Sequence, residues 1–83
     1  MTSYEFTVEK VENSAAESGE FRLVDGYDEI IPCILEVDKA ARRLAEGEIT
    51  EIKATRHKDG TVFVSITGAQ DRIFAKVRRA DNG

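Results

Sequence analysis

The residue best suited to chemistry in this chain is its one histidine, His57, which precedes the turn sequence Lys58-Asp59-Gly60. An imidazole often serves as a general base, and it then needs a substrate within reach and a group that orients it. Asp59 is close in sequence, and Thr61 faces His57 if the turn closes a hairpin. A turn aspartate usually accepts hydrogen bonds from nearby backbone, and a tight turn offers no pocket. We therefore expect a solvated surface histidine rather than a catalytic group.

The sequence patterns for a metal site or a reactive thiol are as weak as the one for a catalytic histidine. Asp25, Asp28 and Glu29 could bind a hard cation, but their spacing is not that of a calcium loop, and helix capping by Asp28 explains the cluster more simply. The one cysteine, Cys33, lies in an apolar run, where cysteine usually behaves as a small buried hydrophobe. No glycine-rich nucleotide loop and no zinc-protease motif is present. We expect no metal, no cofactor, no catalytic residue and no enzymatic activity.

Size and composition indicate a single small domain over residues 1–83. The chain is 41% hydrophobic and 34% charged, which is ordinary for a soluble globular protein. It contains no stretch as long as a membrane span and no signal-peptide pattern, so we expect a cytoplasmic protein. A domain this small is only marginally stabilised by its own core, so we expect that a dimer or a partner could add stability.

Charge is distributed unevenly along the chain, although the net charge is only −4. Residues 1–37 contain nine acids and two bases, whereas residues 38–83 contain seven acids and ten bases. This asymmetry indicates two surfaces of opposite sign. It argues against a protein that coats nucleic acid along its whole surface, but it allows a local basic face.

Alternating apolar residues predict five strands. Two lie at 4–11 and 20–24, joined by a loop at 12–19, and three more at 48–57, 61–67 and 72–79 form a meander. With one helix between the two groups, the order is ββαβββ. The predicted fold class is α+β, an antiparallel sheet with one helix packed on one face.

The helix is predicted from Ile30 to Glu46, followed by a stop at Gly47. Apolar residues at intervals of three and four form its inward stripe: Ile30, Ile34, Val37, Ala41 and Leu44. Pro32 is tolerated in the first turn. The alternative is a strand over 30–37 with a shorter helix after Asp38, because the first half is rich in β-branched residues.

Hairpin register follows from loop length, because facing residues of antiparallel strands share a face. A two-residue turn at Asp59-Gly60 would send Lys53 to the apolar face and Ile52 outward. A three-residue loop, with Gly60 at positive φ in a G1 bulge, gathers the apolar residues instead. It pairs Arg56 with Val62, Ala54 with Val64 and Ile52 with Ile66.

A four-residue loop from Gly68 to Asp71 fixes the next strand pair by the same argument. It pairs Thr67 with Arg72, Ile66 with Ile73, Val64 with Ala75 and Val62 with Val77. One face is then apolar, and we expect the helix to cover it. The opposite face carries polar residues, two phenylalanines and four cations: Lys53, Thr55, His57, Thr61, Phe63, Ser65, Thr67, Arg72, Phe74, Lys76 and Arg78.

Three explanations compete for Phe63 and Phe74 on the face away from the helix. The hairpin of residues 4–24, or a second subunit, could cover them as part of a core. A protein partner could use them with the nearby arginines as a binding surface. Single-stranded RNA or DNA could stack bases on them and place phosphates beside the cations. The sequence leaves open whether residues 4–24 extend the sheet or cover this face.

We expect a small non-enzymatic binding module, of regulatory, adaptor or inhibitor type, that acts by protein–protein interaction. Its candidate partner-binding residues are Phe63, Phe74, Lys53, Arg72, Lys76 and Arg78. The expected partner is another protein or a second copy, not a membrane or a small-molecule cofactor. A phage- or plasmid-encoded inhibitor that uses its acidic N-terminal half is a variant of this prediction. The alternative is a nucleic-acid-binding module that uses the same face.

Overall fold

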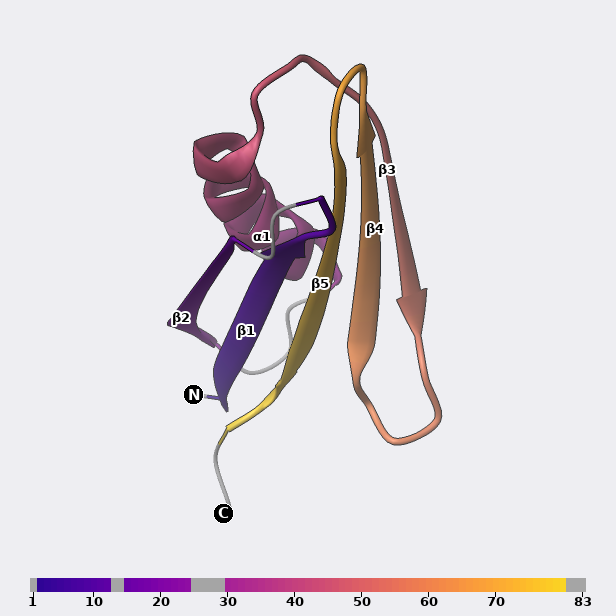
Figure 1. The fold of residues 1–83 in the computed structure, drawn as a ribbon. Coiled ribbons are helices and arrows are strands. Elements are labelled where there is room, and N and C mark those ends of the chain that lie inside the picture. The colour runs from indigo at the N-terminus through magenta and orange to yellow at the C-terminus, as the bar shows by residue number, and fades with distance from the viewer. Residues whose placement is uncertain (1, 13–14, 25–29, 81–83) are drawn as a thin grey trace.

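The computed structural model describes residues 2–12, 15–24 and 30–80. Its elements follow the predicted ββαβββ order: β1 (Thr2–Lys10), β2 (Ala16–Leu23), α1 (Ile30–Leu44), β3 (Ile49–Arg56), β4 (Val62–Gly68) and β5 (Arg72–Arg79). The strands form one antiparallel sheet in the order β2-β1-β5-β4-β3, and α1 packs on one side of it (Figure 1). The predicted α+β fold is therefore confirmed.

The N-terminal hairpin extends the sheet and does not cover its second face. Strand β1 pairs with β5, from Tyr4 opposite Arg79 to Lys10 opposite Ile73, and β2 lies outside β1 as an edge strand. This pairing removes the explanation in which residues 4–24 bury the two phenylalanines. The start of β1 and the end of β5 also lie at the same end of the molecule (Figure 1).

The predicted loop at 12–19 is too long, because β2 begins at Ala16. Small and polar residues can pair in a strand when the neighbouring strand supplies the apolar surface. Gly19 lies opposite Phe6, and a Cβ at Gly19 would come within 2.7 Å of the Phe6 ring. The glycine thus makes room for an aromatic side chain, and the pairing continues across it.

The core lies between α1 and the covered face of the sheet, which the meander and β1 line with β-branched and aromatic residues. In β5, Ile73, Ala75 and Val77 are each at most 3% exposed. At the other end of the sheet, Phe21 stacks on Tyr4 with ring centroids 5.3 Å apart. Cys33 is fully buried, as the sequence predicts for a small hydrophobe.

The helix occupies the predicted segment, so the alternative of a strand over 30–37 is wrong, but its buried stripe is rotated. The fully buried helix residues are Cys33, Val37, Ala40 and Ala41, whereas the predicted Ile34 and Leu44 are half-buried. Ala40 and Ala41 contribute small side chains to the part of the helix that packs in the core. Asp25, Asp28, Glu29 and the side chain of Ile30 lie outside the described residues.

The helix ends at Leu44 rather than at the predicted Glu46. The backbone N–H groups of Glu46 and Gly47 donate to Oδ2 of Asp71, each at 2.9 Å. These bonds to a side chain from the β4–β5 connection hold the chain as it leaves the helix. A contact this distant in sequence decides the boundary, which is why the local pattern misses it.

Both predicted registers of the meander are confirmed. Arg56 pairs with Val62 and Ile52 with Ile66 across β3 and β4, and Val62 pairs with Val77 across β4 and β5. At the first loop, the Gly60 N–H donates to the His57 carbonyl at 3.0 Å, and Gly60 has a φ of 89°. This is the predicted three-residue loop with a bulge at glycine.

One residue of the predicted outer face is placed differently. Thr61 is only 8% exposed, and its N–H donates to Oδ1 of Asp59 at 2.9 Å. The bulge at Gly60 interrupts the regular alternation before β4 begins at Val62, so the residue directly after the bulge does not follow the rule for the strand.

Candidate functional site

The face of the sheet opposite α1, called the open face below, is the candidate functional site. No described segment lies over it, and two large aromatic side chains on it are exposed: Phe63 at 41% and Phe74 at 46%. On the meander, Lys53, Thr55, Phe63, Thr67, Arg72, Phe74, Lys76 and Arg78 are exposed and Ser65 is half-buried. The six predicted partner-binding residues therefore lie together on one surface.

The two phenylalanines are diagonal neighbours at the centre of the open face. Phe63 on β4 lies opposite Lys76, and Phe74 on β5 lies opposite Ser65. Both rings border a shallow hollow of about 340 Å³ that also includes Thr7 and Glu9 from β1. The Lys76 ammonium lies 5.9 Å from the Phe63 ring centroid, within the range of a cation–π contact.

His57 belongs to this surface through Phe63. The two rings meet edge to face with centroids 4.5 Å apart. The nearby Asp59 accepts from the Thr61 backbone instead, and this hydrogen bond holds the pKa of its carboxyl below the ordinary value. The predicted reading of His57 as an exposed residue bordering Phe63 matches its position.

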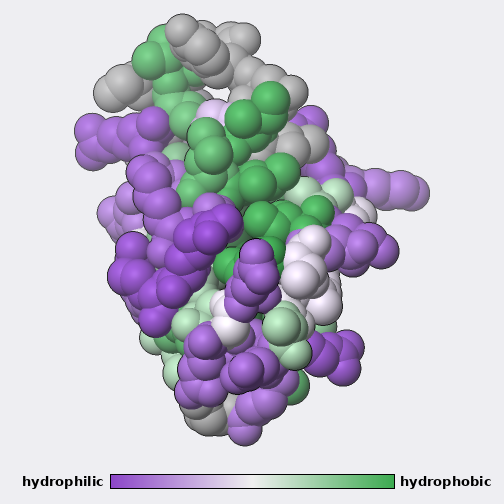
Figure 2. Space-filling model, turned by 90° about the horizontal axis from the view of Figure 1, so that it is seen from above, coloured by the Kyte–Doolittle hydropathy of each residue, from purple (hydrophilic) through white to green (hydrophobic). Residues whose placement is uncertain are grey.

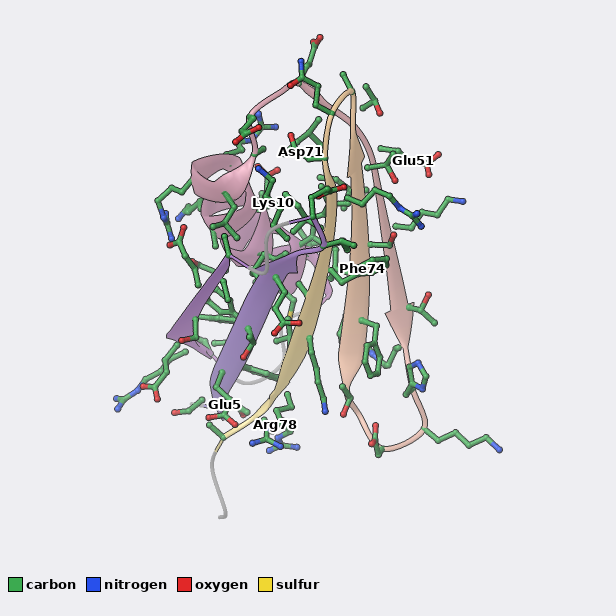
Figure 3. The ribbon with its side chains drawn as sticks, viewed as in Figure 1. Glu5, Lys10, Glu51, Asp71, Phe74 and Arg78 are labelled. Atoms are coloured by element: carbon green, nitrogen blue, oxygen red, sulfur yellow. The ribbon has the colours of Figure 1, made fainter. Side chains whose placement is uncertain are left out.

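The sequence prediction missed the carboxylates that share the open face. Because β1 lies beside β5, Glu5 faces Arg78 and Glu9 faces Phe74, and Glu20 of β2 lies opposite Glu5. Nε of Arg78 donates to Oε1 of Glu5 at 2.6 Å, and the two residues lie side by side where β1 begins and β5 ends (Figure 3). Alternation in residues 4–11 does put Glu5 and Glu9 on one side, but only the β1–β5 pairing places them next to the cations.

A second hollow lies over the acidic side of the open face. It measures about 490 Å³ and spans β2, β1 and β5. Its floor includes the short side chains of Thr7 and Ser18, and Glu5, Glu20 and Arg78 are among the longer residues around it. The hollow exists because short residues on two neighbouring strands lie opposite each other.

A buried ion pair at the end of the covered face is the other charged cluster. Lys10 and Asp71 are 4% and 2% exposed, and Nζ of Lys10 lies 3.1 Å from Oδ1 of Asp71 and 3.4 Å from the more exposed Glu46 (Figure 3). Among the described residues, Oδ1 of Asp71 has no partner other than Lys10, while Oδ2 accepts from the Gly47 and Glu46 N–H groups. The cluster ties β1, the helix end and the β4–β5 loop together.

The pKa values of this pair follow from its hydrogen bonds. The Gly47 N–H, with help from the Lys10 ammonium, holds the pKa of Asp71 below its ordinary value of 3.8. The hydrogen bond to Asp71 raises the pKa of Lys10 above 10.5. Both groups are thus ionised over the neutral range and compensate each other, which suits a structural role rather than proton transfer.

Other surfaces of the described residues show fewer features of a functional site. No group of three or more histidine, cysteine, aspartate or glutamate residues is arranged to hold a metal ion within residues 2–12, 15–24 and 30–80. Ile31 and Leu35 expose apolar surface on the outer side of α1, and an apolar band between charged flanks is visible from above (Figure 2). The part of the chain that the structure describes contains no helix long and apolar enough to cross a membrane.

Comparison of the chain with protein-family models, with curated proteins and with solved structures finds no match. The fold and the open face define a small α+β domain with one covered and one uncovered sheet surface. What this domain does must be argued from that uncovered surface.

Proposed function

We propose that this protein is a non-enzymatic binding module that acts by protein–protein interaction through the open face. The observation that carries the proposal is the exposure of Phe63 and Phe74 at the centre of an uncovered five-stranded sheet. Large aromatic residues ringed by arginine and lysine are typical of the residues that dominate protein interfaces. A regulatory, adaptor or inhibitor role in the cytoplasm fits such a module.

The charges of the open face favour a protein over a nucleic acid. Carboxylates repel phosphates and so weaken the contacts of nearby cations, and Glu5, Glu9 and Glu20 share this surface. Arg78 is bound to Glu5, and Lys53 lies 3.6 Å from Glu51. A protein partner can present both signs of charge and apolar side chains, and so can match such a mixed surface.

A capture experiment with matched variants tests the proposal. The wild-type chain, the double variant Phe63→Ser/Phe74→Ser and the control Ile31→Ser/Leu35→Ser are immobilised and exposed to extract of the source cell. The control loses exposed apolar side chains from the helix and leaves the open face intact. Each protein retained by wild type and control is then purified and titrated against all three chains.

We expect the double variant to weaken binding of that partner at least about tenfold, because exposed aromatic anchors carry much of an interface's energy. Circular dichroism should show all three chains folded. Equal affinity of the double variant and the wild type would contradict the proposal.

A titration with a single-stranded oligonucleotide tests the alternative function. We expect no measurable binding in low salt. Binding that falls steeply between about 0.05 M and about 0.2 M salt, and that is lost in the double variant, would instead favour the nucleic-acid module.

A further inference from the structure

The open face divides into two halves of opposite charge. Among the described residues on β1 and β2, its charged side chains are three acids and one base: Glu5, Glu9, Glu20 and Arg22. Among those on β3, β4 and β5 they are four bases and one acid: Lys53, Arg72, Lys76, Arg78 and Glu51. The boundary between the halves runs along the strands, between β1 and β5.

The two halves also differ in surface shape. The basic half carries the exposed rings of Phe63 and Phe74. The hollow of about 490 Å³ lies over the acidic half, with Thr7 and Ser18 in its floor, and reaches Lys76 and Arg78 at the edge of the basic half. One half therefore projects apolar groups, and the other half recedes.

The geometry points to a second copy of this chain as the partner that binds the open face, in a twofold-symmetric face-to-face dimer. This inference rests on the proposed role of the open face in protein binding. A twofold axis parallel to the strands, near the boundary of β1 and β5, exchanges the two halves. It lays the acidic half of each copy over the basic half of the other. It also turns Phe63, which lies level with Thr7 and Ser18 across the sheet, toward the hollow of the other copy.

Charge selects this axis over the other one available to stacked sheets. A twofold axis across the strands would place the carboxylates of β1 and β2 over the same carboxylates of the second copy. Like charges brought together in an interface are strongly unfavourable, so that arrangement is disfavoured. The self-complementary arrangement requires no rearrangement of the fold.

The extent of the surface suits a small, concentration-dependent dimer interface. An axis at the boundary of β1 and β5 overlaps four strands, which at a spacing of about 4.8 Å give a face about 19 Å wide. Strands of seven to nine residues, at about 3.4 Å per residue, give it a length of about 24–31 Å. The planar footprint is then just below the roughly 600–1,000 Å² per partner of a standard interface.

Charge reversal of the two halves in separate chains gives a decisive experiment. Glu9→Lys/Glu20→Lys leaves Glu5 and Glu51 as the acids of the described open face and makes it largely positive, and Lys53→Glu/Lys76→Glu makes it largely negative. All four substituted residues are exposed. In sedimentation velocity, we expect the wild-type chain to form a dimer and each variant alone to dimerise at least about tenfold more weakly. An equimolar mixture of the two variants should form a heterodimer, because both halves are then complementary.

A control pair carries the same charge changes away from the open face. Glu12→Lys/Glu48→Lys and Lys39→Glu/Lys58→Glu alter exposed residues in turns, loops and the helix. We expect both control variants to dimerise as the wild type does. Restoration by mixing should be confined to the open-face pair, and circular dichroism should show every chain folded.

Three results would overturn the inference. They are a wild-type chain that stays monomeric up to about 1 mM, open-face variants that dimerise as tightly as wild type, and control variants that lose dimerisation alone and regain it when mixed. A monomeric wild-type chain would leave the proposed function standing if Phe63→Ser/Phe74→Ser still abolished binding of another protein. Raising salt from about 0.05 M to about 0.5 M offers a check without mutation, because it should weaken the wild-type dimer.

Discussion

The two faces of this sheet are made by alternate residues of the same strands, yet they differ in nearly every property. On β5, Ile73 is 1% exposed while its neighbour Phe74 is 46% exposed. Among the described residues, the buried part of the covered face holds charge only at the Lys10–Asp71 pair, where each charge has a partner. The open face combines aromatic rings with acids and bases. The fold requires apolar residues on the covered face. It does not require the mixture of aromatic and charged residues on the open face, so function can determine that mixture.

This difference predicts that neighbouring residues respond very differently to truncation. Ile73→Ala removes methyl groups from a packed site and should lower the free energy of unfolding by about 2–5 kcal/mol. Phe74→Ala removes a half-exposed ring and should cost about 1 kcal/mol or less. Urea denaturation of both variants measures the contrast. Both variants are compared at protein concentrations at which the chain is monomeric. Similar losses there would mean that Phe74 is part of a core within the chain, whereas a Phe74→Ala loss that appears only at higher concentration is expected of the proposed dimer.

The buried ion pair provides the next test, because Lys10 and Asp71 are the only buried charged residues in the part of the chain that the structure describes. Asp71→Asn keeps an oxygen that can accept from the Gly47 and Glu46 N–H groups but removes the charge opposite Lys10. We expect a loss of stability smaller than that of Ile73→Ala, because Lys10 keeps Glu46 at 3.4 Å.

The dependence on pH distinguishes the charge of Asp71 from its hydrogen bonds. Its folded pKa lies below 3.8, so its contribution to stability is complete above about pH 3.8 and is lost as the pH falls through the folded pKa. The Lys10 pKa is raised above 10.5, so its contribution is complete below that pH and is lost as the pH rises through the folded pKa. Denaturation of Asp71→Asn should show a shallower acid dependence than wild type. Parallel acid profiles would show that the charge contributes nothing.

The sequence predicts the meander well because its loops are short and its strands alternate regularly. A three-residue loop at Lys58-Asp59-Gly60 puts Ile52 and Ala54 on the same side as Val64, whereas a two-residue turn does not, so the register follows without knowledge of the rest of the chain. The helix is predicted as an element, but its buried side depends on how closely Ala40 and Ala41 approach the sheet. Packing decides that, and a periodic pattern alone does not.

The site is predicted less completely because it depends on a pairing between distant strands. The cations and phenylalanines follow from local register, but their acidic neighbours require β1 to lie beside β5. One signal was available for the Lys10–Asp71 pair: Lys10 follows Tyr4, Phe6 and Val8 at the next inward position. A lysine at an inward position calls for a buried acid, although the sequence does not say which one.

A smaller effect is expected at β2, where Gly19 and Ser18 lie on opposite faces. Gly19→Ala places a Cβ within 2.7 Å of the Phe6 ring, and because that ring is 7% exposed it must shift within the core. We expect a loss of about 1–2 kcal/mol, which is typical of overpacking. Ser18→Ala, on the open face, should change stability by less than about 0.5 kcal/mol. Equal values in thermal denaturation would mean that the ring moves without cost.

The smallest change in stability should come from substitution of His57, the residue whose side chain is best suited to catalysis. Its ring contacts Phe63 at the edge of the open face, and the turn beside it is held by backbone groups and by Asp59. His57→Gln should therefore change the free energy of unfolding by less than about 0.5 kcal/mol. Asp59→Ala should destabilise more, because it removes the acceptor for the Thr61 N–H. His57→Gln could instead abolish binding by the open face while Asp59→Ala left it intact. The contact surface would then extend from the phenylalanines to the hairpin tip, and the charged halves would contribute less to binding than Phe63, Phe74 and His57.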